Sequence, residues 1–379
     1  MTARPPEAET PPPPTVPLPD TGSAPIPNAA VVPPSGGGTA PLWVALPGDI
    51  DDPANPSGGN RYDRRVIDEL RQVRPVHEIR LTGAWPRPGD PALAGHLAGL
   101  PDGADVLLDG LVACGVPELI EPSAARLRLT VLVHLSLGDE TGLSEEQVAE
   151  LTALEGRTLR AATAVITTSA GAARRLIARH GLPPAKVRVA PPGVDPAPPA
   201  TPSTGGGRLT CVAAVIPRKG QDVLVAALDK LDDLDWECVC VGALDRAPAF
   251  VHKLTGGKVH FVGTRAGDAL ADTYAGTDLL ILPSRAETYG MVVTEALARG
   301  IPVLGTAVDG VPEALGLAPD GTRPGMLVPP GDPAALAGAL REWLTDDGLR
   351  QHLRAAAAGR RQALRGWDKT AQDLTEGMR

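Results

Sequence analysis

The stretch that decides the fold is PSRAETYGMVVTEALARGIPVLGTAVDGVPE, residues 283–313. It follows an apolar run and reads as a loop, a helix and a second strand, the alternation typical of a parallel sheet covered by helices. Glu287 lies in the loop, and Glu295 lies about a turn and a half into the helix. This arrangement directs two carboxylates and a helix N-terminus toward one crevice. Carboxylates accept hydrogen bonds from hydroxyls and a helix N-terminus attracts phosphate, so the segment suits a nucleotide-sugar.

The same alternation extends through the chain, which at 379 residues is too long for one compact core. We expect a disordered proline-rich tail over 1–40, a first domain over 41–195, a linker over 196–207, and a second domain with terminal helices over 208–379. The expected fold class is α/β, with two doubly wound Rossmann-like domains that face a central cleft. The strands are expected at 42–46, 76–81, 105–108, 129–134, 164–168, 208–214, 237–242, 259–262, 278–282, 301–305 and 326–328.

Composition limits the classes of function. A formal net charge of -9 argues against a nucleic-acid binder, because phosphate binding needs a basic face. No apolar stretch reaches the length of a membrane span, and the start of the chain has no signal-peptide pattern. The four cysteines have no metal-ligand spacing and are expected to be reduced and buried, which predicts a cytoplasmic location. They are Cys114, Cys211, Cys238 and Cys240.

A pair of cations follows the first strand of the second half. Arg218 and Lys219 precede Gly220 in the loop before a helix, where two fixed charges can neutralise a diphosphate leaving group. A solvated basic pair is the alternative. No Asp-x-Asp pair follows a strand, since the run from Asp233 to Asp235 precedes one, and we therefore expect no metal and no cofactor beyond the donor substrate.

The first half offers fewer signals. Gly58 and Gly59 follow the first strand and open a helix, as a loop that approaches phosphate does, although a plain turn explains the pair equally well. His134 ends a strand and should face the cleft, unless it is a satisfied histidine at a strand end. The first helix carries five arginines for which a solvated face is favoured over peripheral membrane contact. They are Arg61, Arg64, Arg65, Arg71 and Arg74.

From about residue 208 onward the sequence resembles the retaining nucleotide-sugar glycosyltransferases of the GT-B fold, family 4. The motifs that carry the resemblance are PRKG, PSRAETYG, TEALARG, IPVLGTAVDGVPE and LVPPGDPAALAGAL. The resemblance implies that Glu287 contacts the donor sugar and that Glu295 binds the ribose hydroxyls. It also implies that the backbone of Thr288, Tyr289 and Gly290 contacts the sugar and the diphosphate.

The resemblance is fainter before residue 208, and there is one departure after it. In the family a glycine loop bends over the donor phosphates and a histidine lies near the reacting sugar, which implies these roles for Gly58, Gly59 and His134. The family often has an arginine five residues before the lysine, but Ala214 stands there. Arg218 is the residue that could replace the missing arginine.

The resemblance implies transfer of a sugar from a nucleotide diphosphate to a hydroxyl of a small molecule or glycan, with retention and without metal. No carboxylate is evident at the position of His134 to act as a covalent nucleophile, so we expect same-face attack with the leaving phosphate as base. One alternative is a non-catalytic relative that only binds a sugar-nucleotide. The other is a nicotinamide-dependent oxidoreductase, which would require a G-x-G-x-x-G motif that neither domain contains.

Overall fold

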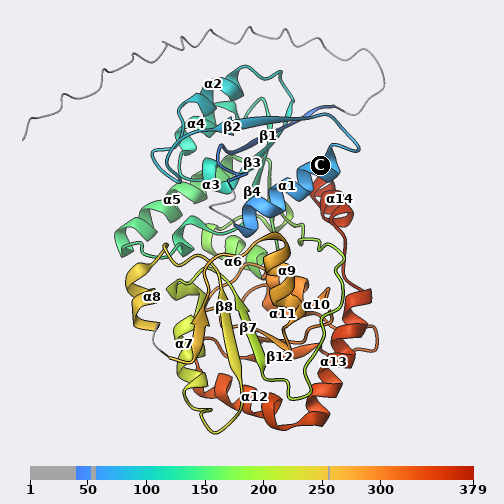
Figure 1. Cartoon of the computed structure of the whole chain (residues 1–379). Coiled ribbons are helices and arrows are strands. Elements are labelled where there is room, and N and C mark those ends of the chain that lie inside the picture. Colours follow the sequence, from blue (N-terminus) through green and yellow to red (C-terminus); the bar gives the residue numbers. More distant parts are fainter. Residues whose placement is uncertain (1–39, 53–56, 255–256) are drawn as a thin grey trace, which may run out of the picture. The chain divides into compact units, whose positions relative to one another are not determined.

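The computed structural model describes residues 40–52, 57–254 and 257–379 (Figure 1). The predicted proline-rich tail lies outside the described residues, apart from Ala40.

The first half forms a six-stranded sheet in which all paired strands are parallel, in the order β2-β1-β3-β4-β5-β6. Its strands are β1 (Leu42–Pro47), β2 (Val76–Leu81), β3 (Asp105–Asp109), β4 (Arg128–Val133), β5 (Ala164–Thr167) and β6 (Val187–Val189). Its helices are α1 (Gly58–Leu70), α2 (Ala92–Ala98), α3 (Gly110–Ala113), α4 (Pro117–Ile120), α5 (Glu145–Ala161) and α6 (Ala170–His180). Short 3-10 turns cover Glu121–Ser123, Leu137–Asp139 and Pro184–Lys186.

The second half forms another six-stranded parallel sheet, in the order β12-β11-β10-β7-β8-β9. Its strands are β7 (Arg208–Val212), β8 (Glu237–Val241), β9 (Val259–Phe261), β10 (Leu279–Leu282), β11 (Val303–Thr306) and β12 (Gly325–Val328). A 3-10 turn covers Pro217–Lys219, and the helices are α7 (Gln221–Leu228), α8 (Pro248–Leu254), α9 (Gly267–Ala275), α10 (Met291–Leu297), α11 (Val311–Leu315), α12 (Pro333–Thr345), α13 (Asp347–Gln362) and α14 (Trp367–Gly377). The expected α/β class with two doubly wound sheets is confirmed.

Side-chain caps begin several of these helices where the sequence places them. Ser144 and Gln147 form the expected capping box at the start of α5, and Ser169 accepts from the amide of Ala172 at the start of α6. Asp332 caps α12 ahead of Pro333, which occupies the first helical position. These caps set where each helix starts relative to the strand before it.

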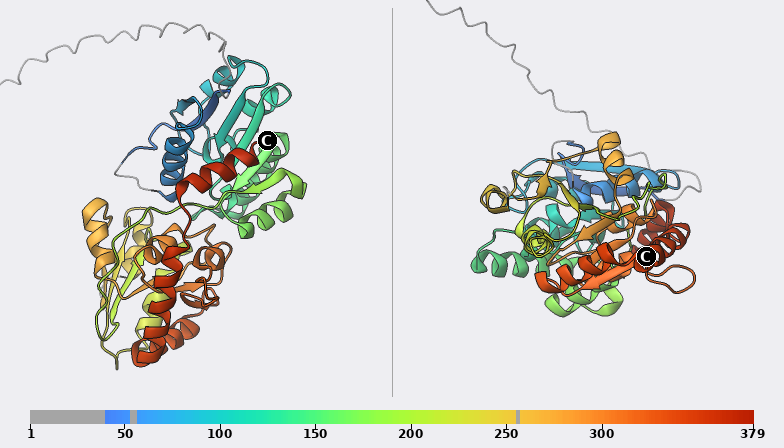
Figure 2. Two further views of the ribbon diagram at one scale, coloured as in Figure 1. Left: turned by 90° about the vertical axis from the view of Figure 1, so that its right-hand side faces the viewer. Right: turned by 60° about the horizontal axis from the view of Figure 1, so that its bottom comes forward.

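The last helix corrects the expected division of the chain, because α14 packs on the first sheet rather than on the second. Trp367 and Leu374 are buried in the same apolar cluster as Leu42 and Val44 of β1. The views in Figures 1 and 2 both place α14 beside α1. Alternate side chains of β1 point to opposite faces of the sheet, and each face carries its own apolar cluster. Both faces must therefore be covered by helices to exclude water, and α14 covers part of the face that carries Leu42 and Val44.

The chain therefore crosses between the two sheets twice, and the crossings touch. The amide of Val194 donates to the carbonyl of Arg365 at 3.0 Å. A Cβ added to Gly193 would lie 2.5 Å from the carbonyl carbon of Gly366, so only glycine allows this approach. The two connecting segments run side by side at this point.

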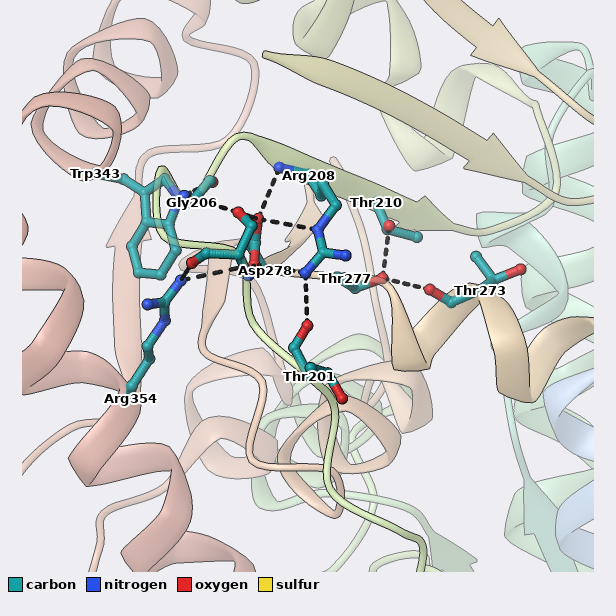
Figure 3. Close-up of polar contacts among 10 residues, drawn as sticks. Thr201, Gly206, Arg208, Thr210, Thr273, Thr277, Asp278, Trp343 and Arg354 are labelled. Carbon is teal, nitrogen blue, oxygen red and sulfur yellow. Dashed lines mark hydrogen bonds and ion pairs between the residues drawn. The ribbon is translucent and has the colours of Figure 1, made fainter. Parts of the chain in front are cut away.

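A buried carboxylate anchors the second half of the linker to the second sheet. Asp278, just before β10, accepts from the backbone amide and the hydroxyl of Ser203 at 2.6 Å each and from the amide of Arg208 at 2.9 Å (Figure 3). Arg354 of α13 lies 3.6 Å away and adds a cation. Burial alone would raise its pKa, but these hydrogen bonds outweigh burial and the pKa of Asp278 lies below its ordinary value.

Replacing Asp278 with Asn should destabilise the fold at neutral pH by about 2 kcal/mol or more, because three converging donors lose their anionic acceptor. Since the pKa of Asp278 is lowered, its contribution is present above the ordinary carboxyl range and is lost as pH falls through and below it. Urea unfolding should therefore show a gap in the free energy of unfolding between wild type and Asp278→Asn, and this gap should narrow as the pH falls into the acid range. The exposed Asp235→Asn is the control. A gap that stays constant with pH contradicts the assignment.

Candidate active site

Lys219 and Glu287 are brought together as the sequence predicts. Lys219 ends the 3-10 turn after β7, and Glu287 lies in the loop between β10 and α10. The Nζ of Lys219 donates to Oε2 of Glu287, and the hydroxyl of Ser284 lies 3.5 Å from the same oxygen. The two side chains are only 16% and 10% exposed, so the ion pair is largely shielded from water. Shielding strengthens the field of both charges on any ligand placed against them.

Arg218 is placed beside this pair through its backbone. Its carbonyl accepts from the amide of Arg285 at 2.8 Å, which joins the 3-10 turn to the loop that carries Glu287. Its side-chain Nε is buried and has no hydrogen-bond partner among the described residues. Near the position of the missing arginine, Gln221 donates to the carbonyl of Ala214 at 2.9 Å. The backbone contact places Arg218 next to the loop that carries Glu287, and its role as a second cation stays a prediction.

The backbone of residues 288–290 lies where the two halves meet. Gly290 adopts a φ of +90°, which favours glycine, and directs the chain into α10. The hydroxyl of Ser169 donates to the carbonyl of Thr288 at 2.6 Å. Burial raises the pKa of Tyr289 to about 12, so its hydroxyl stays neutral. The sequence led us to expect that a helix dipole attracts phosphate here. Because α10 has only seven residues, its dipole is small, and the backbone amides at its start are the stronger attraction for an anion.

Glu295 in α10 is buried and doubly held. Its Oε2 accepts from the hydroxyl of Tyr274 at 2.8 Å, and its Oε1 accepts from the guanidinium of Arg61 in α1. Asp195 lies 3.5 Å from the same guanidinium. The proposed ribose ligand is thus paired with an arginine from the first domain, a partner that the sequence did not reveal.

The arginines in and just after α1 are exposed or half-buried, which agrees with the solvated face that the sequence favoured, and each of them also pairs with a carboxylate. Arg61 and Arg65 pair with Asp195, and Arg61 also with Glu295. The remaining pairs are Arg64 with Asp51 and Glu78, Arg71 with Asp68 and Glu78, and Arg74 with Asp105. The position of Arg61, one turn after Gly58, was the signal that it could reach the site.

The two glycines of the first domain lie next to predicted site residues. A Cβ on Gly58 would lie 3.7 Å from the sulfur of Met291, the first residue of α10. A Cβ on Gly59 would lie 3.1 Å from Cδ2 of His134, so the loop and the histidine are in contact. The glycine pair is therefore placed between His134 on one side and the start of α10 on the other.

His134 follows β4 directly and is held by two residues of α1. Its Nε2 lies 2.7 Å from Oδ1 of Asp63, and its ring packs edge-on against Tyr62 with centroids 5.0 Å apart. Burial lowers the pKa of His134, but the charge and hydrogen bond of Asp63 outweigh burial, so the net pKa is raised. His134 is thus a hydrogen-bonded histidine at a strand end, as the alternative interpretation expected, and its ring is held by Asp63 and Tyr62.

Two carboxyl groups near His134 were missed by the sequence analysis, which found none at its position. Asp63 and Asp109 are 3% and 5% exposed, and one atom from each lies within 4.8 Å of the His134 ring nitrogen. Asp109 ends β3, the strand beside β4, so its proximity to His134 could have been inferred from strand order. Asp63 lies four residues after Gly59, on the same helix face. Such a donor set could also hold a divalent cation.

The loop that follows His134 is fixed by a buried glutamate of α5. Glu155 accepts from the hydroxyl of Ser136 at 3.0 Å and from the amide of Leu137 at 3.1 Å, and it pairs with His180 at 2.8 Å. Beyond this loop, Arg175 of α6 pairs with Asp139 and with Asp309. These contacts tie the His134 loop to the segment that carries the glutamates.

No helix in the described ranges is both long enough and apolar enough to traverse a bilayer.

Comparison with known proteins was made for the sequence and for the fold. Residues 56–198 match the family model of Glycosyltransferase Family 4, and residues 206–346 match that of the Glycosyl transferases group 1. The D-inositol 3-phosphate glycosyltransferase of Stackebrandtia nassauensis is 32% identical over 241 residues, 56% of this chain and 52% of the relative. The sulfoquinovosyl transferase SQD2 of Arabidopsis thaliana is 33% identical over 140 residues, 37% of this chain and 27% of the relative. The chain thus spans about half the length of the first of these relatives.

Solved structures share the fold at low sequence identity. A sucrose-phosphate synthase from Thermosynechococcus elongatus superposes with a TM-score of 0.68 at 22% identity, covering 89% of this chain and 98% of its own. HepE from Anabaena, solved in complex with UDP and glucose, gives a TM-score of 0.68 at 19% identity over 89% of this chain and 98% of its own. With one family model matched by each sheet domain, this chain belongs to the family 4, group 1 glycosyltransferases of the GT-B fold.

Proposed function

We propose that this protein transfers a sugar from a nucleotide diphosphate donor to an acceptor hydroxyl, with retention of anomeric configuration and without a metal. The observation that carries the proposal is the pair formed by Lys219 and Glu287, set beside Glu295 and the glycine pair of the first domain. The reaction occurs where the two domains meet, so binding both substrates there makes the step effectively unimolecular.

The two glutamates are the anchors for the donor. Each buried carboxylate can exchange its present partner for hydroxyls of a sugar, because a hydroxyl donates to a carboxylate as an ammonium or guanidinium does. Glu287 would receive the hydroxyls of the transferred sugar, and Glu295 those of the ribose. The backbone of Thr288, Tyr289 and Gly290 lies between them and would contact the diphosphate.

The cations provide for the leaving group. As the bond from the anomeric carbon to the diphosphate breaks, negative charge grows on the departing oxygens. Lys219 and Arg218 would stabilise that charge in place of a metal ion. The acceptor hydroxyl then attacks from the same face and passes its proton to the leaving phosphate, while Gly58 and Gly59 cover the phosphates and His134 contacts the sugar.

The named relatives suggest where to start in choosing substrates. HepE was solved with UDP and glucose, and several sequence relatives are named as D-inositol 3-phosphate glycosyltransferases. A first panel should therefore combine UDP-, GDP- and ADP-hexoses with polyol phosphates and simple glycans as acceptors. The four cysteines are free and buried, and we place the reaction in the cytoplasm.

One observation favours a second candidate function. Ala214 stands where many family members have an arginine, so the chain could bind a sugar-nucleotide without transferring it. The same panel decides between the two, because only an enzyme releases nucleoside diphosphate in an acceptor-dependent way. A chain that binds a donor in a thermal-shift assay but never releases it would be the non-catalytic relative.

Replacing Glu287 with Gln should lower kcat/KM by a factor of about 100 or more, because the transferred sugar loses its charged acceptor in the transition state. The fold should survive, since the amide still accepts a hydrogen bond from Lys219. Activity is measured as nucleoside diphosphate release and folding as the thermal midpoint. The exposed Glu342→Gln serves as the matched control. Unchanged kinetics in Glu287→Gln would remove this residue from the site.

Replacing Arg61 with Met should tighten the binding of nucleoside diphosphate by up to tenfold, about 1.4 kcal/mol. The reason is that Arg61 occupies Oε1 of Glu295, so ribose must displace it. Calorimetric titration of wild type and variant with the nucleotide that gives the largest thermal shift measures the change. Arg71→Met, at the C-terminal cap of the same helix but paired with Glu78, should bind as wild type does. Weaker binding by Arg61→Met would instead show that Arg61 contacts the nucleotide.

The product should keep the anomeric configuration of the donor, and EDTA should not slow its formation. Proton NMR of the product, with the anomeric coupling constant compared to that of the donor sugar, tests the first point. The same reaction run in excess chelator tests the second. An inverted product would refute the same-face mechanism, and inhibition that Mg²⁺ reverses would refute the metal-free mechanism.

A further inference from the structure

Three titratable side chains lie close together in the first domain, those of Asp63, Asp109 and His134. Asp109 ends β3, His134 follows the neighbouring β4, and Asp63 lies in the second turn of α1 above them. The ligand atoms of the three side chains all lie within 4.8 Å of one another. Nothing in the proposed transfer uses the two carboxyl groups, although they are among the most buried acids of the described chain.

One buried carboxylate oxygen of this group has no hydrogen-bond donor. Oδ1 of Asp63 pairs with Nε2 of His134 at 2.7 Å, and Oδ1 of Asp109 accepts from the amide of Leu111 at 2.7 Å. Oδ2 of Asp63 is buried and has no hydrogen-bond partner in the described chain. A buried acceptor left without a donor costs about 1–3 kcal/mol, and two neighbouring carboxylates resist ionising together. A single proton resolves both difficulties.

We propose that Asp109 is a carboxylic acid whose proton is donated to Oδ2 of Asp63, and that Asp63 in turn accepts from Nε2–H of His134. This chain of two hydrogen bonds makes Asp63 and Asp109 positioning residues for the imidazole. The inference rests on the proposed function for what the imidazole does, but the shared proton stands on the geometry alone.

The surroundings favour a proton over other partners. The small cavity beside the two carboxyl groups is lined by apolar side chains, among them Val44, Leu107 and Leu132. The ionisable groups that face the pair are His134, the buried thiol of Cys114 just after α3, and Tyr62, whose hydroxyl donates to the carbonyl of Ala190. No lysine or arginine of the described residues pairs with either acid.

The ionisation behaviour agrees with the shared proton. Burial and then the charge of Asp63 raise the pKa of Asp109 to about 7. The pKa of His134 is raised as well, because the pairing with Asp63 outweighs the effect of burial. Below about pH 7 the acid proton is in place, and raising the pH through this value removes it and leaves two anions side by side.

A metal ion accounts for the geometry less well. A divalent ion that bound both side chains at about 2.1 Å would hold their ligand atoms more than about 3 Å apart in a tetrahedral site. The observed 2.7 Å between His134 and Asp63 is instead the length of a charge-assisted hydrogen bond.

The consequence concerns the orientation of the ring. With Nε2 held by Asp63, the Cδ2 edge against Gly59 and the ring against Tyr62, the imidazole has one orientation. Nδ1 is then the nitrogen left for a ligand, and Asp63 favours the cationic form of the ring. A cationic imidazole can donate from Nδ1 to an oxygen of the donor.

The decisive variant is Asp109→Asn, because an amide mimics the protonated acid. Its Oδ1 can still cap the amide of Leu111, and its NH₂ donates to Asp63 at every pH. The wild-type kcat should fall as pH rises through about 7. In Asp109→Asn this alkaline loss should be absent or displaced upward by a unit or more. At pH 6.5, Asp109→Asn should exceed Asp109→Ala in kcat by tenfold or more. An alkaline limb that is the same in wild type and Asp109→Asn would overturn the proposal.

Asp63→Asn separates positioning from packing. Its amide keeps the shape but removes the charge that attracts the imidazole, so kcat should fall at least tenfold while KM for the donor changes less than threefold. A fall in the thermal midpoint with kcat unchanged would show a structural role alone and would overturn the proposal.

A measurement without turnover keeps the proton testable if no substrate is found. Because the pKa of Asp109 is raised, its contribution to stability is present in acid and is lost as pH rises toward about 7. The urea midpoint of wild type should therefore fall relative to that of Asp109→Asn between pH 5 and pH 8. Parallel midpoints would overturn the assignment, as would Mg²⁺ or Zn²⁺ stabilising wild type but not the variant. The stability shift without transfer from any donor would refute the proposed function while supporting the shared proton.

Discussion

Buried carboxylates held by donors from other elements are the constraint on which this site depends. Glu287 is held by Lys219, and Glu295 by Tyr274 and Arg61. An unpaired charge at such depth would cost several kcal/mol, so the side chains have fixed partners before any ligand arrives. A ligand that enters must offer equivalent donors. Because each buried carboxylate needs hydrogen-bond donors, the site favours a ligand that is rich in hydroxyl groups.

The connections of the chain support the same site. The segments through Gly193 and Gly366 lie against each other, and beyond the second of them α14 completes the core of the first domain. Any movement of one sheet relative to the other must pass through this doubled segment. Two further contacts join the first domain to the second: Ser169 donates to Thr288, and Arg175 pairs with Asp309. Any closing movement of the two sheets over a substrate would thus be guided by two covalent connections rather than one.

Much of this could be predicted from the sequence, and the rest could not for identifiable reasons. The strand and helix order was predictable because apolar runs, caps and glycine turns are local signals, as at Ser144 and Asp332. The partner of α14 was not, because an amphipathic helix shows that one face is buried but not which sheet it covers. Lys219 and Glu287 were predictable from their places in loops between strand and helix, and the resemblance in motifs gave them their roles. Asp109 could have been inferred from strand order, because β3 lies beside β4, but the contacts of Arg61 and Asp63 depend on the rotation of α1, which is a tertiary fact.

Because Ala214 carries no charge, the proposed leaving diphosphate depends on the remaining cations of the site. Before a donor binds, Lys219 is neutralised by Glu287, and a bound diphosphate would require the same ammonium to serve two anions. A chain with an arginine at position 214 would have a further cation to share this load. Here the groups left for the leaving group are Arg218, whose Nε has no partner among the described residues, and the imidazole of His134, whose pKa is raised by Asp63. Under the proposed function, the first domain would supply part of the charge that position 214 does not provide, through an imidazole that Asp63 and the protonated Asp109 hold in one orientation.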